Sequence, residues 1–152
     1  KFEKAKHCLE VITREENIPI RFNGQSKQLH NCYEIVDILP FILFENAIKY
    51  SYNKNPIECI FTEENGQLKE ICVSNKAILP EENDLSKLKK KHFRSISAKN
   101  ITGTGKGLFI ASLICEYHNI ELSIETGNTK IIEGKKIGDF MVKLNTAAID
   151  HR

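Results

Sequence analysis

The chain has 152 residues, of which 41% are hydrophobic, and its 22 Lys and Arg against 20 Asp and Glu leave a net charge of +2. This length and apolar fraction suffice for one buried core, and we expect a single domain over residues 1–152. The nearly balanced charge argues against a nucleic-acid-binding protein. No apolar run approaches the roughly 20 residues of a membrane helix, which argues against direct membrane insertion, and no signal peptide is recognisable, so we expect a cytoplasmic location.

Periodicity and turn residues predict the elements in chain order. An amphipathic helix near Phe2 to Glu15 comes first, and a strand at Ile18 to Phe22 follows it. A buried helix around Leu39 to Ser51 precedes two strands, which are joined by an Asn65-Gly66 hairpin turn. The strands before and after this turn are expected at Pro56 to Glu63 and at Leu68 to Ser74. We expect the next helix at Phe109 to His118, and the two terminal strands at Ile120 to Thr126 and at Ile137 to Asn145.

The buried helix carries three polar residues on one face. Helical spacing places Asn46, Lys49 and Tyr50 on adjoining positions, while the apolar residues around them supply a core-facing surface. Asn46 offers an amide oxygen to magnesium, Lys49 a positive charge to phosphate, and Tyr50 a flat amphipathic ring to a base or sugar. Any one of these residues alone is more typical of the solvated end of a core helix.

A glycine-rich segment leads into the last predicted helix. Gly103, Gly105 and Gly107 alternate with Thr104 and Lys106, and Leu108 begins the apolar run. Glycine lets backbone N–H groups approach an anion, and the positive end of the following helix favours negative charge. This segment predicts a phosphate cradle, although glycine clusters also form ordinary helix-entry turns. For Lys106 we expect solvent exposure rather than a phosphate contact.

Together these segments resemble a known ATPase superfamily. Asn46 to Ser51 resembles the N box of the GHKL ATPases, which include histidine kinases, gyrase, Hsp90 and MutL, and Gly103 to Leu108 resembles their G2 box. The likeness is greatest to the ATP-binding domain of sensor histidine kinases and spans nearly the whole chain. It implies an α+β Bergerat fold, a two-layer α/β sandwich in which helices cover one face of a mixed, mostly antiparallel sheet.

The resemblance implies Mg-ATP as the ligand, with Asn46 as the magnesium ligand. The implied catalytic residues are Asn46 and Lys49. The implied nucleotide-binding residues are Asn46, Lys49, Tyr50, Asn75, Arg94, Gly103, Thr104, Gly105, Gly107 and Leu108.

One motif of this superfamily is altered. Its G1 box, Asp-x-Gly-x-Gly, corresponds here to Asn75, Ala77 and Leu79 with no glycine. The amide oxygen of Asn75 still offers an acceptor to the adenine amino group, though a weaker one than a carboxylate. Ala77 and Leu79 add side chains beside the expected base pocket, which narrow it or reshape the adjoining loop.

The residue one helical turn before Asn46 bears on hydrolysis. This position holds Ile42, which takes no proton, and the neighbouring Glu45 points roughly 100° around the helix. We interpret Glu45 as a charge at the helix edge or a partner of Lys49. A water-activating ATPase resembling MutL or Hsp90 is therefore disfavoured, whereas phosphoryl transfer to a separate histidine needs mainly positioning and charge neutralisation.

Residues 75–102 correspond to the ATP lid of the superfamily. Arg94 resembles the lid arginine that reaches phosphate, and Phe93 the hydrophobic residue that holds the lid against the body. The lysine run at 87–91 is also consistent with a solvated helix face or a nucleic-acid patch. The low net charge favours the lid.

Five cysteines lack the spacing of metal ligands, and we interpret them as reduced thiols, mostly in the core, with a Cys59–Cys72 disulfide as a minority alternative. The five histidines lack the His-Glu-x-x-x-Pro context of a phosphoacceptor. They are His7, His30, His92, His118 and His151.

The resemblance therefore implies partners outside these residues. We expect the acceptor histidine on a separate dimerisation domain of the same protein, with a response regulator as the next partner. The location is then cytoplasmic, alone or as the cytoplasmic part of a membrane-bound sensor. The alternative function is a non-catalytic scaffold or nucleotide sensor of the same fold in a signalling complex.

Overall fold

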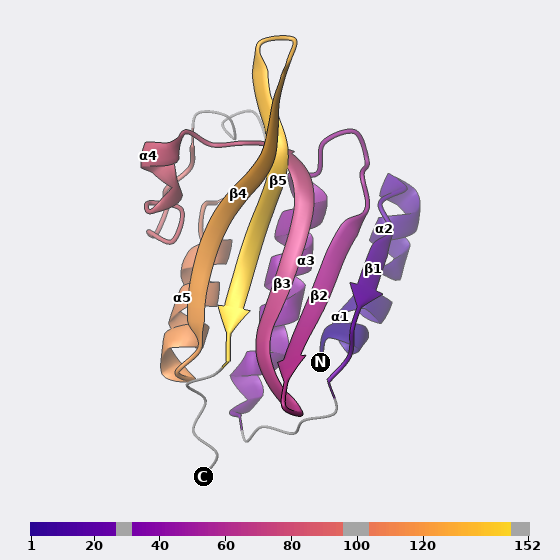
Figure 1. Cartoon of the computed structure of the whole chain (residues 1–152), viewed down its shortest axis with the longest axis vertical. Coiled ribbons are helices and arrows are strands. Elements are labelled where there is room, and N and C mark those ends of the chain that lie inside the picture. The colour runs from indigo at the N-terminus through magenta and orange to yellow at the C-terminus, as the bar shows by residue number, and fades with distance from the viewer. Residues whose placement is uncertain (27–31, 96–103, 147–152) are drawn as a thin grey trace.

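A five-stranded mixed sheet forms the front layer of the domain (Figure 1). The computed structural model describes residues 1–26, 32–95 and 104–146. The strands are β1 (Ile20–Asn23), β2 (Ile57–Glu64), β3 (Gln67–Ile78), β4 (Glu121–Ile132) and β5 (Lys135–Asn145), in the spatial order β1-β2-β3-β5-β4. Only the β1–β2 pair is parallel, and the other three pairs are antiparallel.

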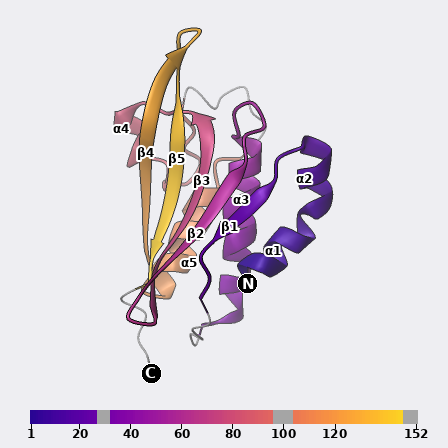
Figure 2. The same cartoon turned by 45° about the vertical axis from the view of Figure 1, so that its right-hand side comes forward.

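Helices cover one face of this sheet, as the turned view in Figure 2 shows. They are α1 (Phe2–Cys8), α2 (Glu10–Glu16), α3 (Leu39–Lys49) and α5 (Gly107–Tyr117), while the 3₁₀ helix η1 (Glu34–Ile38) leads into α3 and the short α4 (Glu82–Leu85) lies to one side. The predicted two-layer α+β fold with a mixed, mostly antiparallel sheet is confirmed.

The core lies between α3, α5 and the inner face of the sheet. Leu43 and Phe44 of α3 are almost completely buried, and burial of each such side chain contributes about 1.5–3 kcal/mol. Alternate residues of the central strands face them, with Val73 of β3 opposite Val142 of β5. Phe2 closes one end of the core through edge-on contact with Phe44, at a centroid distance of 5.8 Å.

Turn chemistry predicted the β2–β3 hairpin correctly. Asn65 and Gly66 both have positive φ, 51° and 73°, as a two-residue type I′ turn requires. Other boundaries differ from the prediction. The first helix is interrupted at Leu9, whose side chain turns into the core, and β3 and β4 run beyond Ser74 and Thr126 because they pair with the extended β5.

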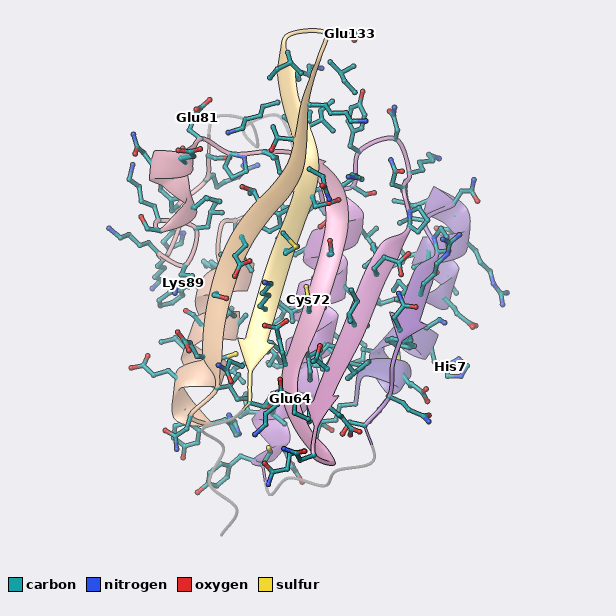
Figure 3. The ribbon with its side chains drawn as sticks, in the orientation of Figure 1. His7, Glu64, Cys72, Glu81, Lys89 and Glu133 are labelled. Atoms are coloured by element: carbon teal, nitrogen blue, oxygen red, sulfur yellow. The ribbon has the colours of Figure 1, made fainter. Side chains whose placement is uncertain are left out.

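The cysteines form no disulfide, so the Cys59–Cys72 alternative is wrong. Cys59 stands opposite Val73 and Cys72 opposite Ile60, which places the two sulfurs on opposite faces of the sheet. Figure 3 shows Cys72 on the face turned away from the helices. Burial raises the pKa of Cys59 to about 12, of Cys115 to about 12 and of Cys72 to about 11, which keeps these three thiols protonated.

Within the described residues, no helix has the length and apolar character needed to cross a membrane.

We expect alkylation to distinguish the thiols by their burial. In native protein at pH 8, iodoacetamide should modify the exposed Cys8 first and the half-buried Cys32 more slowly, because reaction needs an accessible thiolate. Cys59, Cys72 and Cys115 should react only after unfolding, as followed by peptide mass spectrometry. Rapid native labelling of Cys59 would contradict this arrangement of the core.

Candidate functional site

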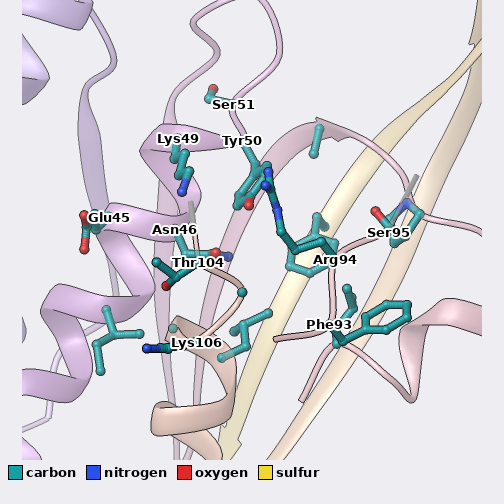
Figure 4. A pocket seen from close by; sticks show the side chains of 18 of the residues that line it. Glu45, Asn46, Lys49, Tyr50, Ser51, Phe93, Arg94, Ser95, Thr104 and Lys106 are labelled. Carbon is teal, nitrogen blue, oxygen red and sulfur yellow. The ribbon is translucent and has the colours of Figure 1, made fainter. Parts of the chain in front are cut away.

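A cavity of about 670 Å³ lies where the C-terminal end of α3, the segment after β3 and the start of α5 meet. Figure 4 shows its side chains from close by. The cavity is lined by Ile42, Glu45, Asn46, Lys49, Tyr50, Ser51, Tyr52, Ala77, Ile78, Pro80, Leu88, Phe93, Arg94, Ser95, Thr104, Gly105, Lys106, Gly107, Leu108, Ile110 and Phe140.

The helix α3 supplies one wall through its last turns. Asn46, Lys49 and Tyr50 all line the cavity, so the predicted shared face is present, although the helix ends at Lys49 and Tyr50 caps it. The Lys49 ammonium lies 5.5 Å from the centre of the Tyr50 ring. The exposed Glu45 and the apolar Ile42 line the same wall.

The floor of the cavity is not a glycine-rich loop, because β3 continues as a strand into the segment that corresponds to the G1 box. Ile78 pairs with Ile137, and the Leu79 N–H donates to the Lys136 carbonyl at 2.8 Å. Gly138 makes this possible, since a β-carbon there would lie 2.9 Å from Cδ1 of Leu79. Leu79 is therefore buried against β5 and does not line the cavity, whereas Ala77 does.

Asn75 lies beside the cavity rather than in its wall. The residue is 4% exposed, and its amide nitrogen donates to the Lys76 carbonyl at 3.2 Å. Its neighbours Ala77 on β3 and Phe140 on β5 do line the cavity. The other described candidate residues therefore line the same cavity. Asn75 does not line it but lies next to residues that do.

Two lysines of the lid segment after β3 hold it in place, one through contacts within the segment and one through a contact with the sheet. Lys87 pairs with Asp84 at 3.1 Å and its ammonium lies 5.8 Å from the centre of the Phe93 ring. Lys89 donates to the Leu122 carbonyl of β4 at 3.2 Å. Part of the lysine run therefore stabilises the lid, and the half-buried Phe93 and Arg94 line the cavity. Residues 96–102 of the predicted lid lie outside the described residues.

Gly105 joins the glycine-rich segment to the lid. Its φ is +67°, and a β-carbon would lie 2.8 Å from the Phe93 carbonyl oxygen, while its own carbonyl accepts a hydrogen bond from His92 N–H at 3.1 Å. Gly107 is less constrained, because its β-carbon would meet only Cγ2 of Ile42, at 3.6 Å. Thr104 and Leu108 line the cavity, and Gly103 lies outside the described residues.

Several lining residues were missed by the sequence reasoning. Tyr52, Phe140 and Ile110 add aromatic and apolar surface. Tyr52 is fixed there by its N–H, which donates to the Lys76 carbonyl at 2.7 Å. Its position two residues after Tyr50 is the only signal in the sequence, and Phe140 is indistinguishable there from an ordinary core residue.

The charges of the cavity favour an anion. Among the described residues, Lys49, Arg94 and Lys106 line it together with one carboxylate, that of Glu45. No group of three or more His, Cys, Asp or Glu in the described part of the chain could hold a metal ion. A divalent cation here would need oxygens from a ligand in addition to the amide of Asn46, which is how proteins commonly hold magnesium with nucleotides.

Comparison with known proteins finds similarity in sequence to a sensor histidine kinase. No protein-family model matches the chain. Sensor histidine kinase YkoH of Bacillus subtilis (strain 168) is 40% identical over 88 residues, which are 56% of this chain and 18% of that protein. The matched region is thus a small part of that relative.

Solved structures of histidine kinases share the fold. The mycobacterial sensor histidine kinase MprB has a TM-score of 0.71 at 15% identity, covering 95% of this chain and 92% of that one. The nucleotide-free catalytic domain of histidine kinase ThkA has a TM-score of 0.64 at 19% identity, with 95% and 90% covered. Full-length ShkA in complex with AMPPNP scores 0.62 at 14% identity, with 97% and 30% covered.

The domain therefore has the fold of histidine-kinase catalytic domains. This fold and the sequence similarity to a sensor histidine kinase agree with the resemblance drawn from the N box and the G2 box.

Gly105 and Gly107 form a matched pair for testing the lid attachment. We expect Gly105→Ala to lower the free energy of unfolding by about 1–3 kcal/mol, because the new methyl group overlaps the Phe93 carbonyl and the backbone is left-handed. Trypsin should then cleave the lid after Lys87 to Lys91 faster than in the parent protein. Gly107→Ala should leave both readouts unchanged, and equal behaviour of the two variants would contradict the contact.

Proposed function

We propose that this domain binds Mg-ATP in the cavity and acts as the ATP-binding catalytic domain of a sensor histidine kinase, donating the γ-phosphoryl group to a histidine on a separate dimerisation domain of the same protein. The observation that carries the proposal is the gathering of Asn46, Lys49, Arg94 and Thr104 around one cavity. The shared fold and the sequence similarity to a sensor histidine kinase support it.

In this proposal, different residues of the cavity bind the metal ion, the phosphates and the adenosine. Asn46 holds magnesium through its amide oxygen, and the ion supplies charge neutralisation between the phosphates when it is bound. Lys49 and Arg94 bind phosphate oxygens, and the phosphate chain lies beside the backbone of Gly105 and Gly107 at the start of α5. The apolar surface of Tyr50, Ala77 and Phe140 receives the adenosine.

Phosphoryl transfer fits the cavity better than hydrolysis does. Ile42 stands one turn before Asn46 and has no group that could activate water, and Glu45 is exposed at the edge of the wall. Transfer to a histidine supplied from another domain asks this domain only to position the nucleotide and to neutralise its charge. The phosphorylated histidine would then serve a response regulator as the next partner.

A non-catalytic scaffold or nucleotide sensor remains the second candidate function, and one observation favours it. The strand β3 runs through the segment where the superfamily has its G1 box, and the Leu79 side chain packs directly against Gly138. A site whose floor is a continuous strand has less freedom to adjust around a base than one with a glycine turn.

Replacement of Asn46 tests the metal site. We expect Asn46→Ala to abolish the magnesium dependence of binding of a non-hydrolysable ATP analogue and to weaken the affinity at least tenfold, about 1.4 kcal/mol, measured by calorimetric titration. Asn23→Ala, at an exposed asparagine on β1, is the matched control and should bind like the parent. Unchanged affinity in Asn46→Ala would refute this role, and no binding by the parent protein would favour the scaffold.

Replacement of Asn75 tests adenine recognition. The hydrogen bond to Lys76 uses the amide nitrogen, so the amide oxygen is the acceptor that an adenine amino group requires. We propose that the base lies deep against Ala77 and Phe140 and reaches this oxygen. Asn75→Leu should then weaken ATP binding about tenfold while leaving GTP binding unchanged, as measured by competition titration. Equal losses for both nucleotides would assign Asn75 a purely structural role.

A further inference from the structure

Lys106 does not simply project away from the domain. It directly precedes α5, whose Ile110 N–H donates to the Lys106 carbonyl at 2.9 Å, and its exposed side chain lines the mouth of the cavity. Along α3, Ile42 beside Gly107, then Asn46 and then Tyr50 follow one another about a turn apart, and in Figure 4 Thr104 and Asn46 lie between Lys106 and Tyr50. Lys106 is therefore exposed, as expected, and it also forms part of the cavity wall.

The surroundings of Lys106 suit a contact with the end of a phosphate chain. Its neighbour Gly107 lies against Ile42, the apolar residue of the α3 wall, with 3.6 Å between Ile42 Cγ2 and an added β-carbon. In the described part of the chain, the cavity is lined by three cationic side chains, Lys49, Arg94 and Lys106, and by the carboxylate of Glu45. A lysine ammonium is a flexible point charge with three donors, which suits a terminal phosphate.

We propose that Lys106 is a specificity-determining residue that binds the terminal phosphate of a nucleoside triphosphate, so that the site distinguishes ATP from ADP. This inference rests on the proposed function. The nucleotide is oriented along the cavity by its lining. The aromatic and apolar surface at Tyr50 binds the base, and Asn46 binds the metal at the middle of the site. The third phosphate then extends toward Lys106, whereas a diphosphate ends short of it.

The test compares the affinity for a non-hydrolysable ATP analogue with that for ADP, both with magnesium, by calorimetric titration of the parent protein and three variants. We expect Lys106→Leu to lose about tenfold in affinity for the ATP analogue and less than twofold for ADP, so that the ratio of the two affinities collapses. Lys106→Arg should retain most of the ratio, because it keeps the charge. Lys130→Leu, on the β4–β5 hairpin, removes the same charge away from the cavity and should leave the ratio unchanged.

The outcomes separate this inference from the function on which it rests. Magnesium-dependent ATP binding by the parent with an unchanged ratio in Lys106→Leu would overturn the role of Lys106 and leave the proposed function standing. Equal losses for ATP and ADP would also overturn it, because they would place Lys106 at an inner phosphate. No nucleotide binding by the parent protein would overturn both.

Discussion

The antiparallel pairing of β3 with β5 is the constraint on which the rest of the domain depends. It runs without interruption from Glu70 opposite Asn145 to Ile78 opposite Ile137, and its inner face carries the side chains against which α3 and α5 pack. The same pairing determines the floor of the cavity, because it keeps the segment after Asn75 in an extended conformation. Gly138 is the residue that permits this, since only a missing β-carbon leaves space for Leu79 and for the Gly127 carbonyl.

The cavity therefore combines a fixed floor with a separately attached lid. The floor is held by main-chain hydrogen bonds along a central strand, which are among the most protected in a protein. The lid segment is attached instead by separate contacts, which include the packing of Leu85 and Leu88 on the core, the hydrogen bond between His92 and Gly105, and that of Lys89 with β4. Adjustment to any ligand is expected on the lid side of the cavity, where Arg94 lies, and not at its floor.

The sequence predicted those parts of the fold and site that depend on local chemistry. The type I′ turn at Asn65 follows from two residues that tolerate positive φ, and helical spacing brought Asn46, Lys49 and Tyr50 to one wall. The prediction was less accurate where contacts between distant segments determine the structure. The extension of β3 needs β5 as a partner, and the contribution of Phe140 to the cavity depends on sheet register, which no short pattern contains.

The contact between Lys89 and the Leu122 carbonyl has a consequence beyond the cavity. In the sheet order β4 is an outer strand, and the carbonyls on the open side of such a strand are acceptors that another polypeptide could use. A lid lysine occupies one of them, so the lid shields the sheet margin as well as bordering the ligand site. Displacing the lid would free a backbone acceptor on β4, and the tendency of the domain to self-associate would then vary with the position of its lid.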